Sequence, residues 1–166
     1  MSGNLLRFTD ALARESEAAA PPPPVAELHL VTFALDREEY GIPVAQVREV
    51  IRVGDITRVP QAPAHVRGVT NLRGRILPVV ELRSRLGLEP AAPTSRSRIV
   101  VVEVRDRVLG LLVDAVLQVV KVPRETVAPT PEEVRSSDTQ YLGGVARWND
   151  RLVILLELEQ ALIPQE

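Results

Sequence analysis

The chain has 166 residues, enough for one ordinary domain or two very small ones. Hydrophobic residues make up 45% of the sequence, so a substantial core can form. The 20 basic residues are nearly balanced by 22 acidic ones, which excludes a broad positive field for nucleic acid or anionic lipid. Aromatic residues, at 3%, are too few for a base-stacking surface, and the absence of cysteine excludes disulfides and thiolate chemistry.

Residues 1–26 differ from the rest and predict a flexible leader rich in alanine and proline. Its four consecutive prolines favour an extended polyproline segment, although Leu5, Phe8 and Leu12 have helical spacing and leave a short partner-binding helix as the alternative. Charged residues interrupt the start of the chain, unlike in a signal peptide. No apolar run approaches the roughly 20 residues needed to span a bilayer, so the sequence predicts a cytoplasmic protein.

Residues 28–51 predict a strand followed by a helix. Residues 28–35 are rich in β-forming side chains, and the polar residues after them predict a turn. Pro43 suits the first position of a helix, where its missing N–H is not needed. The apolar residues that follow fall on one face of the predicted helix: Val44, Val47, Val50 and Ile51.

The second half of the chain repeats the residue order of the first. Residues 31–53 align with residues 100–122 without a gap, and residues 68–86 align with residues 144–162. The offset rises from 69 to 76 residues, which implies an insertion of seven residues in the second copy. Chance alignment of apolar runs is the alternative, but matched glycine, arginine and glutamate positions disfavour it. Two small, related β-barrels packed together account for such a repeat.

Two segments of the second copy need a choice of secondary structure. The spacing of residues 113–120 is helical, but their density of β-branched side chains favours a strand, which we predict. Residues 157–163 contain neither glycine nor proline, and they predict one or two helical turns near the C-terminus.

The titratable residues form no recognisable catalytic set. His29 alternates with apolar strand residues, and His65 lies in a proline-flanked connection. Glu81 and Glu157 occupy equivalent positions in the two copies, which indicates a shared structural role and not a catalytic carboxylate pair. No nucleophile turn and no phosphate-binding loop is present in the sequence. We therefore expect no enzyme, no cofactor and no metal, and a small-ligand barrel would need a convergent polar set that the sequence does not place.

The two predicted hairpins differ at their turns. Residues 66–72 and 75–82 predict a hairpin closed by Arg73-Gly74, where the second copy has Asn149-Asp150. Asparagine and aspartate tolerate the positive φ of such turns, whereas arginine gains nothing from it. A guanidinium on a rigid hairpin tip offers five donors with little further entropy to lose, so this exception to the turn rule indicates a binding residue, the alternative being a solvated arginine.

The segment Asn71–Leu82, with the sequence NLRGRILPVVEL, resembles the signature of CheW-like adaptor proteins. Other landmarks of that family match in the same order along residues 27–163. They are Tyr40–Pro43, Val47–Ile51, Pro63, Gly68-Val69, Val108–Asp114, Tyr141-Leu142 and Leu152–Leu158.

This resemblance implies an all-β fold with minor helix: two related five-stranded β-barrel subdomains packed together, and a short C-terminal helix. We expect subdomain one at about residues 27–90 and subdomain two at about residues 96–163, with an exchange of some strands left open. The resemblance also implies a non-catalytic adaptor that couples chemoreceptors to a CheA-type histidine kinase. Such an adaptor binds the kinase regulatory domain and the tip of the receptor's cytoplasmic hairpin, at membrane-associated receptor arrays.

The resemblance also assigns residues to the two kinds of contact. A receptor helix would lie in a groove between the barrels, which is a helix-in-groove contact. The receptor-binding residues would be Val47, Glu49, Gly68, Asn71, Arg73, Gly110 and Val116. The kinase-binding residues would be Tyr40, Ile42, Val127, Glu132 and Glu133. The Glu132-Glu133 pair departs from the family pattern, which often has an apolar residue there, and this puts the second kinase contact in doubt.

Other functions of the same scaffold stay open from sequence. One is a CheW-fold scaffold for a pathway outside chemotaxis, such as surface motility or array positioning. Another is a fragment of a larger kinase or of a receiver-bearing coupling protein. The 166 residues contain neither a phosphoacceptor histidine setting nor a receiver domain, so a stand-alone adaptor is favoured.

Overall fold

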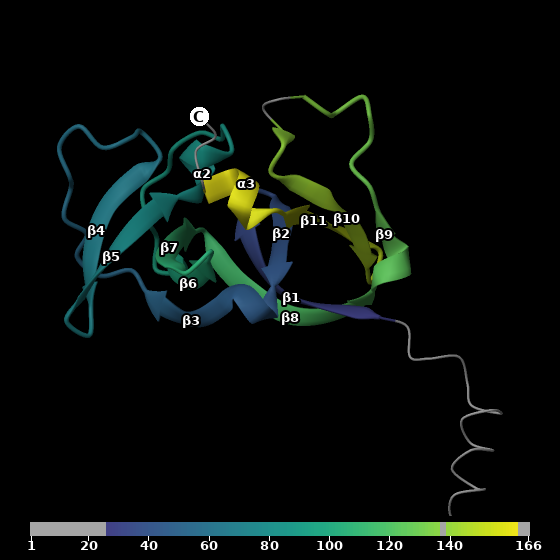
Figure 1. Cartoon of the computed structure of the whole chain (residues 1–166), viewed down its shortest axis with the longest axis horizontal. Helices are drawn as coiled ribbons and strands as arrows, with labels where there is room; N and C mark the ends of the chain where they lie inside the picture. Colours follow the sequence, from purple (N-terminus) through teal and green to yellow (C-terminus); the bar gives the residue numbers. More distant parts are fainter. Residues whose placement is uncertain (1–25, 137–138, 163–166) are drawn as a thin grey trace, which may run out of the picture.

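The computed structural model describes residues 26–136 and 139–162, so the predicted leader lies outside the described residues except for Ala26. Short strands and tight turns follow each other along the chain (Figure 1). The strands of the first half are β1 (Glu27–Leu35), β2 (Glu38–Pro43), β3 (Val47–Arg52), β4 (Val66–Leu72) and β5 (Arg75–Glu81). The strands of the second half are β6 (Arg98–Val104), β7 (Arg107–Val113), β8 (Ala115–Pro123), β9 (Val127–Ala128), β10 (Leu142–Trp148) and β11 (Arg151–Leu156). The helical turns are η1 (Val44–Gln46), α2 (Leu82–Arg85), η2 (Arg124–Thr126) and α3 (Leu158–Leu162).

The strands form two sheets, which lie side by side in Figure 1. Sheet A has the order β8-β1-β2-β11-β10-β9, and sheet B has the order β3-β6-β7-β5-β4. Each sheet therefore has five principal strands, to which sheet A adds the two-residue strand β9. The predicted all-β fold of two related subdomains with minor helix is confirmed.

Each sheet takes strands from both copies of the repeat. Sheet A combines β1 and β2 of the first copy with β8 to β11 of the second, while sheet B combines β6 and β7 with β3, β4 and β5. The boundary expected near residues 90–96 therefore does not separate the sheets. The copies are joined in sheet A by the parallel pair β2–β11 and in sheet B by the parallel pair β5–β7. The exchange is reciprocal, so each copy completes the sheet of the other.

The structural repeat follows the offsets found in the sequence. Strand β10 begins and ends 76 residues after β4, and the two-residue turns between β4 and β5 and between β10 and β11 are equivalent. Strand β6 ends 69 residues after β1. The two predicted hairpins are confirmed, and so are the strand within residues 113–120 (β8) and the short helix α3. Most of the extra length of the second copy lies between β9 and β10.

The predicted helix over residues 44–51 is wrong. Only the 3₁₀ turn η1 forms, and residues 47–52 continue as strand β3. Partly buried and exposed positions alternate along β3, a period of two that valine and isoleucine favour in a strand. Pairing of β3 with β6 satisfies the backbone groups on one side of this edge strand, so tertiary contacts override the helical spacing.

Three groups of buried side chains form the interior. The largest group lies between the sheets and includes Phe33 and Ile42 from sheet A, Val100 and Leu111 from sheet B, and Leu158 from α3. A second group lies within sheet A and a third within sheet B. Because the central group draws on both sheets, burial of apolar surface holds the two subdomains together.

Candidate partner-binding surfaces

The β4–β5 hairpin tip has a backbone conformation that arginine rarely adopts. The φ angles are 51° at Arg73 and 82° at Gly74, and at the equivalent Asn149 and Asp150 they are 47° and 61°. Positive φ at both central residues is typical of the tightest hairpin turns, which favour asparagine and glycine. Asn71 stabilises the first turn, because its Oδ1 accepts a hydrogen bond of 2.8 Å from the Gly74 amide.

Arg73 forms a two-pronged ion pair with Glu49 of β3. The Nη1–Oε2 and Nη2–Oε1 distances are 2.6 and 2.8 Å. Strands β3 and β4 are the two edges of sheet B, so this pair connects opposite edges of one sheet. The hydrogen bond from Arg73 lowers the pKa of Glu49, and the same bond raises the pKa of Arg73. The Arg73 side chain stays 73% exposed, so a partner can reach its remaining donors.

A depression of about 280 Å³ lies beside this ion pair. Its apolar lining includes Leu72, Leu77 and Val101, and Ile76 stands at it with 78% of its surface exposed. The sequence analysis did not single out Ile76. Its position, two residues after the Arg73-Gly74 turn, was the signal that could have identified it. The site therefore combines an exposed guanidinium with an apolar surface, as protein-docking sites do.

The equivalent face of sheet A is built differently. Glu39 of β2 is 5% exposed and forms an ion pair with Arg151, and it accepts a hydrogen bond of 3.2 Å from Gln118 Nε2. Gln118 and Asn149 occupy the positions that Glu49 and Arg73 have in sheet B. The exposed arginine–glutamate pair is therefore a feature of sheet B and not of the repeat.

Val47 and Val116 occupy equivalent positions on the edge strands β3 and β8. Both side chains are partly buried, and both pack against the core group that lies between the sheets. The structure thus places these two predicted receptor-binding residues at the junction of the subdomains, with Glu49 farther along β3.

The two predicted receptor-binding glycines contact the protein itself. A Cβ on Gly68, whose φ is +149°, would lie 2.2 Å from the Thr57 carbonyl oxygen. A Cβ on Gly110 would lie 2.6 Å from Ile99 Cγ2. Both glycines are needed for close packing within sheet B, and neither presents its backbone at the Arg73 depression.

The predicted first kinase contact includes two buried side chains. Ile42 is 0% and Tyr40 7% exposed, and the Tyr40 ring stacks on Phe33 with centroids 6.2 Å apart. Burial raises the pKa of Tyr40. Both side chains point into the central core. Because Ile42 is fully buried, its side chain cannot contact a partner. Tyr40 also lines a depression of about 350 Å³ beside the β1–β2 turn, together with Leu88.

The predicted second kinase contact lies in β9 and in the connection between β9 and β10. Val127 of β9 packs against the core of sheet A, while Glu132 and Glu133 are exposed in the β9–β10 connection. Val127 and Tyr40 line different cavities, and Glu132 and Glu133 line neither of them, so the two predicted kinase-binding sets lie on separate surfaces.

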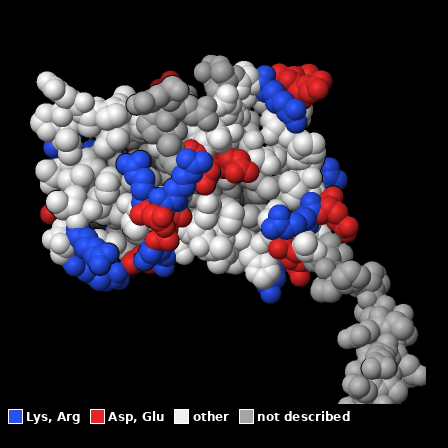
Figure 2. Space-filling model, in the orientation of Figure 1, with Lys and Arg blue, Asp and Glu red and all other residues white. Residues whose placement is uncertain are grey.

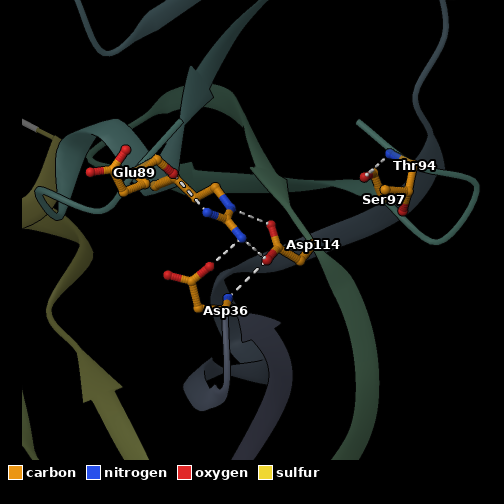
Figure 3. Close-up of polar contacts among 6 residues, drawn as sticks. Asp36, Glu89, Thr94, Ser97 and Asp114 are labelled. Atoms are coloured by element: carbon orange, nitrogen blue, oxygen red, sulfur yellow. Dashed lines mark hydrogen bonds and ion pairs between the residues drawn. The ribbon is translucent and has the colours of Figure 1, made fainter. Parts of the chain in front are cut away.

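Arg83 of α2 joins three segments at the junction of the sheets. Its Nε and Nη2 donate to Asp114 at 2.8 and 2.6 Å, its Nη2 also pairs with Asp36, and its Nη1 donates to the Glu89 carbonyl. Figure 3 shows both aspartate side chains directed at this guanidinium. The hydrogen bond to Asp114 raises the pKa of Arg83 and lowers that of Asp114. The sequence analysis missed this cluster.

The second copy has the same contact with the charges reversed. Arg105, equivalent to Asp36, pairs with Glu159, equivalent to Arg83, at 3.1 Å. Each pair connects a hairpin turn of one sheet with a helix that directly follows a strand of the other sheet: the β1–β2 turn with α2 after β5, and the β6–β7 turn with α3 after β11. Nearby, Arg85 of α2 donates to backbone carbonyls of α3.

The described part of the chain offers no metal site, and the face drawn in Figure 2 carries charges of both signs. No group of three or more His, Asp or Glu that could hold a metal ion occurs within residues 26–136 and 139–162. In Figure 2 the basic and acidic side chains alternate over the visible face. None of the described helices is long and apolar enough to cross a membrane.

Comparison with known proteins gives a consistent result. The model of the CheW-like domain matches residues 29–164. The "Probable chemotaxis protein CheW" of Rhizobium etli is 40% identical over 130 residues, covering 78% of this chain and 84% of the relative. The "Chemotaxis protein CheW" of Rhizobium meliloti is 37% identical and covers 82% and 88%. The crystal structure of the scaffolding protein TtCheW from Thermoanaerobacter tengcongensis superimposes with a TM-score of 0.78 at 33% identity, covering 84% and 95%. This chain belongs to the CheW-like domain family.

Proposed function

We propose that this chain is a non-catalytic adaptor that couples chemoreceptors to a CheA-type histidine kinase in a chemosensory array. The relatives named as chemotaxis proteins and the solved scaffolding protein support the class of function. The observation that carries the proposal is the exposed Arg73–Glu49 pair beside an apolar depression, because it is suited to a protein partner and not to chemistry.

The receptor contact is assigned to the face of sheet B around Arg73. A receptor helix would place apolar side chains against Ile76 and the depression, and a polar or acidic group against the free donors of Arg73. Val47 and Val116 would extend the contact toward the junction of the sheets. Asn71, Gly68 and Gly110 act through the shape of the hairpin and of sheet B.

The kinase contacts are assigned to two surfaces away from that face. One is the β1–β2 turn around the depression lined by Tyr40 and Leu88. The other is the β9–β10 connection with Glu132 and Glu133. Contacts on separate surfaces allow an adaptor to bind receptor and kinase together, and several weak contacts add up in an array. The protein would reach the membrane only through these partners.

Charge reversal at Arg73 tests this assignment. Arg73→Glu should abolish binding of a receptor hairpin tip, because a carboxylate replaces the guanidinium and faces Glu49. It should leave binding of the kinase regulatory domain and the circular dichroism spectrum unchanged. Arg147→Glu, the same charge change at an exposed position of β10, is the matched control and should leave both bindings intact. Equal loss of both partners in Arg73→Glu would contradict the assignment.

A scaffold for a pathway outside chemotaxis is the second function that the sequence left open. Crosslinking in cells through the Arg73 face distinguishes the two. Recovery of chemoreceptors supports the proposal, and recovery of other membrane proteins alone would replace it.

A further inference from the structure

The two copies of the repeat differ at one buried ion pair. In sheet B, Arg67 of β4 pairs with Glu81 at the end of β5, with Nη1 and Oε2 2.9 Å apart and Glu81 6% exposed. The equivalent residues in sheet A are Gly143 and Glu157. The second copy therefore keeps the glutamate and lacks the arginine.

The backbone around the two glutamates is the same. The Glu81 amide donates to the His65 carbonyl and the Glu157 amide donates to the Tyr141 carbonyl, each at 2.7 Å. Arg67 and Gly143 each lie at the register shift of their hairpin, between residues 66 and 68 and between residues 142 and 144. The missing arginine is thus a difference of side chain at an otherwise equivalent site.

Glu157 lies directly beside the position of the missing side chain. A Cβ on Gly143 would lie 3.1 Å from both Cγ and Oε1 of Glu157. Glu157 is exposed and forms no ion pair within the described residues, although Arg124 and Arg135 line the adjoining cavities. The Arg135 Nε donates instead to the Thr130 carbonyl at 3.0 Å.

Open space adjoins this carboxylate on two sides. Gly143 and Glu157 both line a cavity of about 490 Å³, whose walls include Leu28, Leu30 and Val127, and a second cavity of about 450 Å³ at the β9–β10 connection. The volumes exceed what a single ion needs and suit a side chain with an apolar stem.

We propose that Glu157 and the space beside Gly143 bind an arginine side chain of a partner protein, which takes the place that Arg67 has in the first copy. The guanidinium would pair with the Glu157 carboxylate and its methylene groups would cover the apolar wall. The site adjoins the β9–β10 connection and therefore extends the second kinase contact proposed above, but it does not depend on the proposed receptor contact at Arg73. The arginine probe tests it without the kinase.

A titration of the intact, isotope-labelled chain with N-acetyl-arginine amide tests the site by NMR. We expect saturable shifts at the Gly143 and Glu157 amides, and no such shifts with the uncharged N-acetyl-citrulline amide. Equal binding of both probes, or of N-acetyl-lysine amide, would overturn the assignment to arginine. Tighter binding of free arginine than of the capped probe would indicate a free amino acid and overturn the assignment to a protein partner.

Two substitutions make the test specific. Glu157→Gln should weaken probe binding by about tenfold, the loss expected when an amide replaces a paired carboxylate. Gly143→Arg should abolish it and raise the thermal midpoint, because the installed arginine reproduces the Arg67–Glu81 pair. The backbone at Gly143 lies outside the left-handed region, so a side chain there causes no backbone strain, although the Glu157 side chain must shift by a few tenths of an ångström to make room for the new Cβ. Glu125→Gln, at an exposed residue that does not line either cavity, is the control. Unchanged probe binding in Gly143→Arg would overturn the proposal.

Discussion

Single side chains of this protein make their most informative contacts over long sequence separations. Arg83 lies 31 residues from Asp114 and 47 from Asp36, so no local motif announces their cluster. Arg73 was predictable because it breaks a turn rule, and its positive φ confirms that exception. Its pairing with Glu49, 24 residues away, was not predictable, because it forms only where the two edges of sheet B come together.

Replacing Asp114 should destabilise the fold in a pH-dependent way. Asp114→Asn leaves the largely buried Arg83 with one fewer carboxylate, and it should lower the free energy of unfolding by about 1–3 kcal/mol at neutral pH. The pKa of Asp114 is below its ordinary value of 3.8 in the folded protein, so its contribution is present above that value and is lost as pH falls through the folded pKa. The free energies of unfolding of the wild type and of Asp114→Asn, measured in urea, should therefore converge at acidic pH.

The reversed pair Arg105–Glu159 is more exposed, so Glu159→Gln should change the free energy of unfolding by less than about 1 kcal/mol. A larger effect at Glu159 than at Asp114 would contradict the account.

At the scale of secondary-structure elements, the hairpin turns were more predictable than the edge strand β3. Both hairpins turn at the predicted residues, and a two-residue turn fixes the register of its strands. Residues 44–51 failed because valine spacing fits a helix and a half-buried strand alike, and only pairing with β6 decides between them. The packing role of Gly68 and Gly110 could not be predicted for a related reason, since their close neighbours come from other segments of the chain.

The β4–β5 turn should be more stable without its arginine. Arg73→Asn places at the tip the residue that the second copy has there, which adopts positive φ with less strain, and the exposed ion pair that it removes contributes little. We expect the free energy of unfolding to rise by up to about 1 kcal/mol in chemical denaturation, while receptor binding is lost. Loss of stability together with retained binding would contradict the role given to this turn.

At the scale of the whole molecule, the repeat was visible in sequence but the exchange of strands between its copies was only left open. Repeat offsets show which residues are equivalent and not which copy they pair with. The exchange makes the two sheets parts of one folding unit, because neither copy contains a complete sheet. The shared central core has the same effect.

A core substitution in sheet B should therefore destabilise sheet A equally. Leu77→Ala removes a 3% exposed side chain from the sheet B core and should lower stability by about 2–5 kcal/mol. Trp148, the only tryptophan, packs against the sheet A core and reports on that sheet by fluorescence. Its unfolding midpoint should move together with the midpoint seen by circular dichroism. A Trp148 transition that stays at the wild-type midpoint would show that the sheets unfold separately.

The central claim is that separate surfaces of one scaffold bind receptor and kinase at the same time. Its most direct measurement is the mass of the complex formed when the purified chain is mixed with a CheA regulatory domain and a receptor hairpin tip. The account predicts a complex that contains all three proteins, with the affinity for each partner unchanged by the other. Mutually exclusive binding of the two partners, or binding of neither, would contradict it.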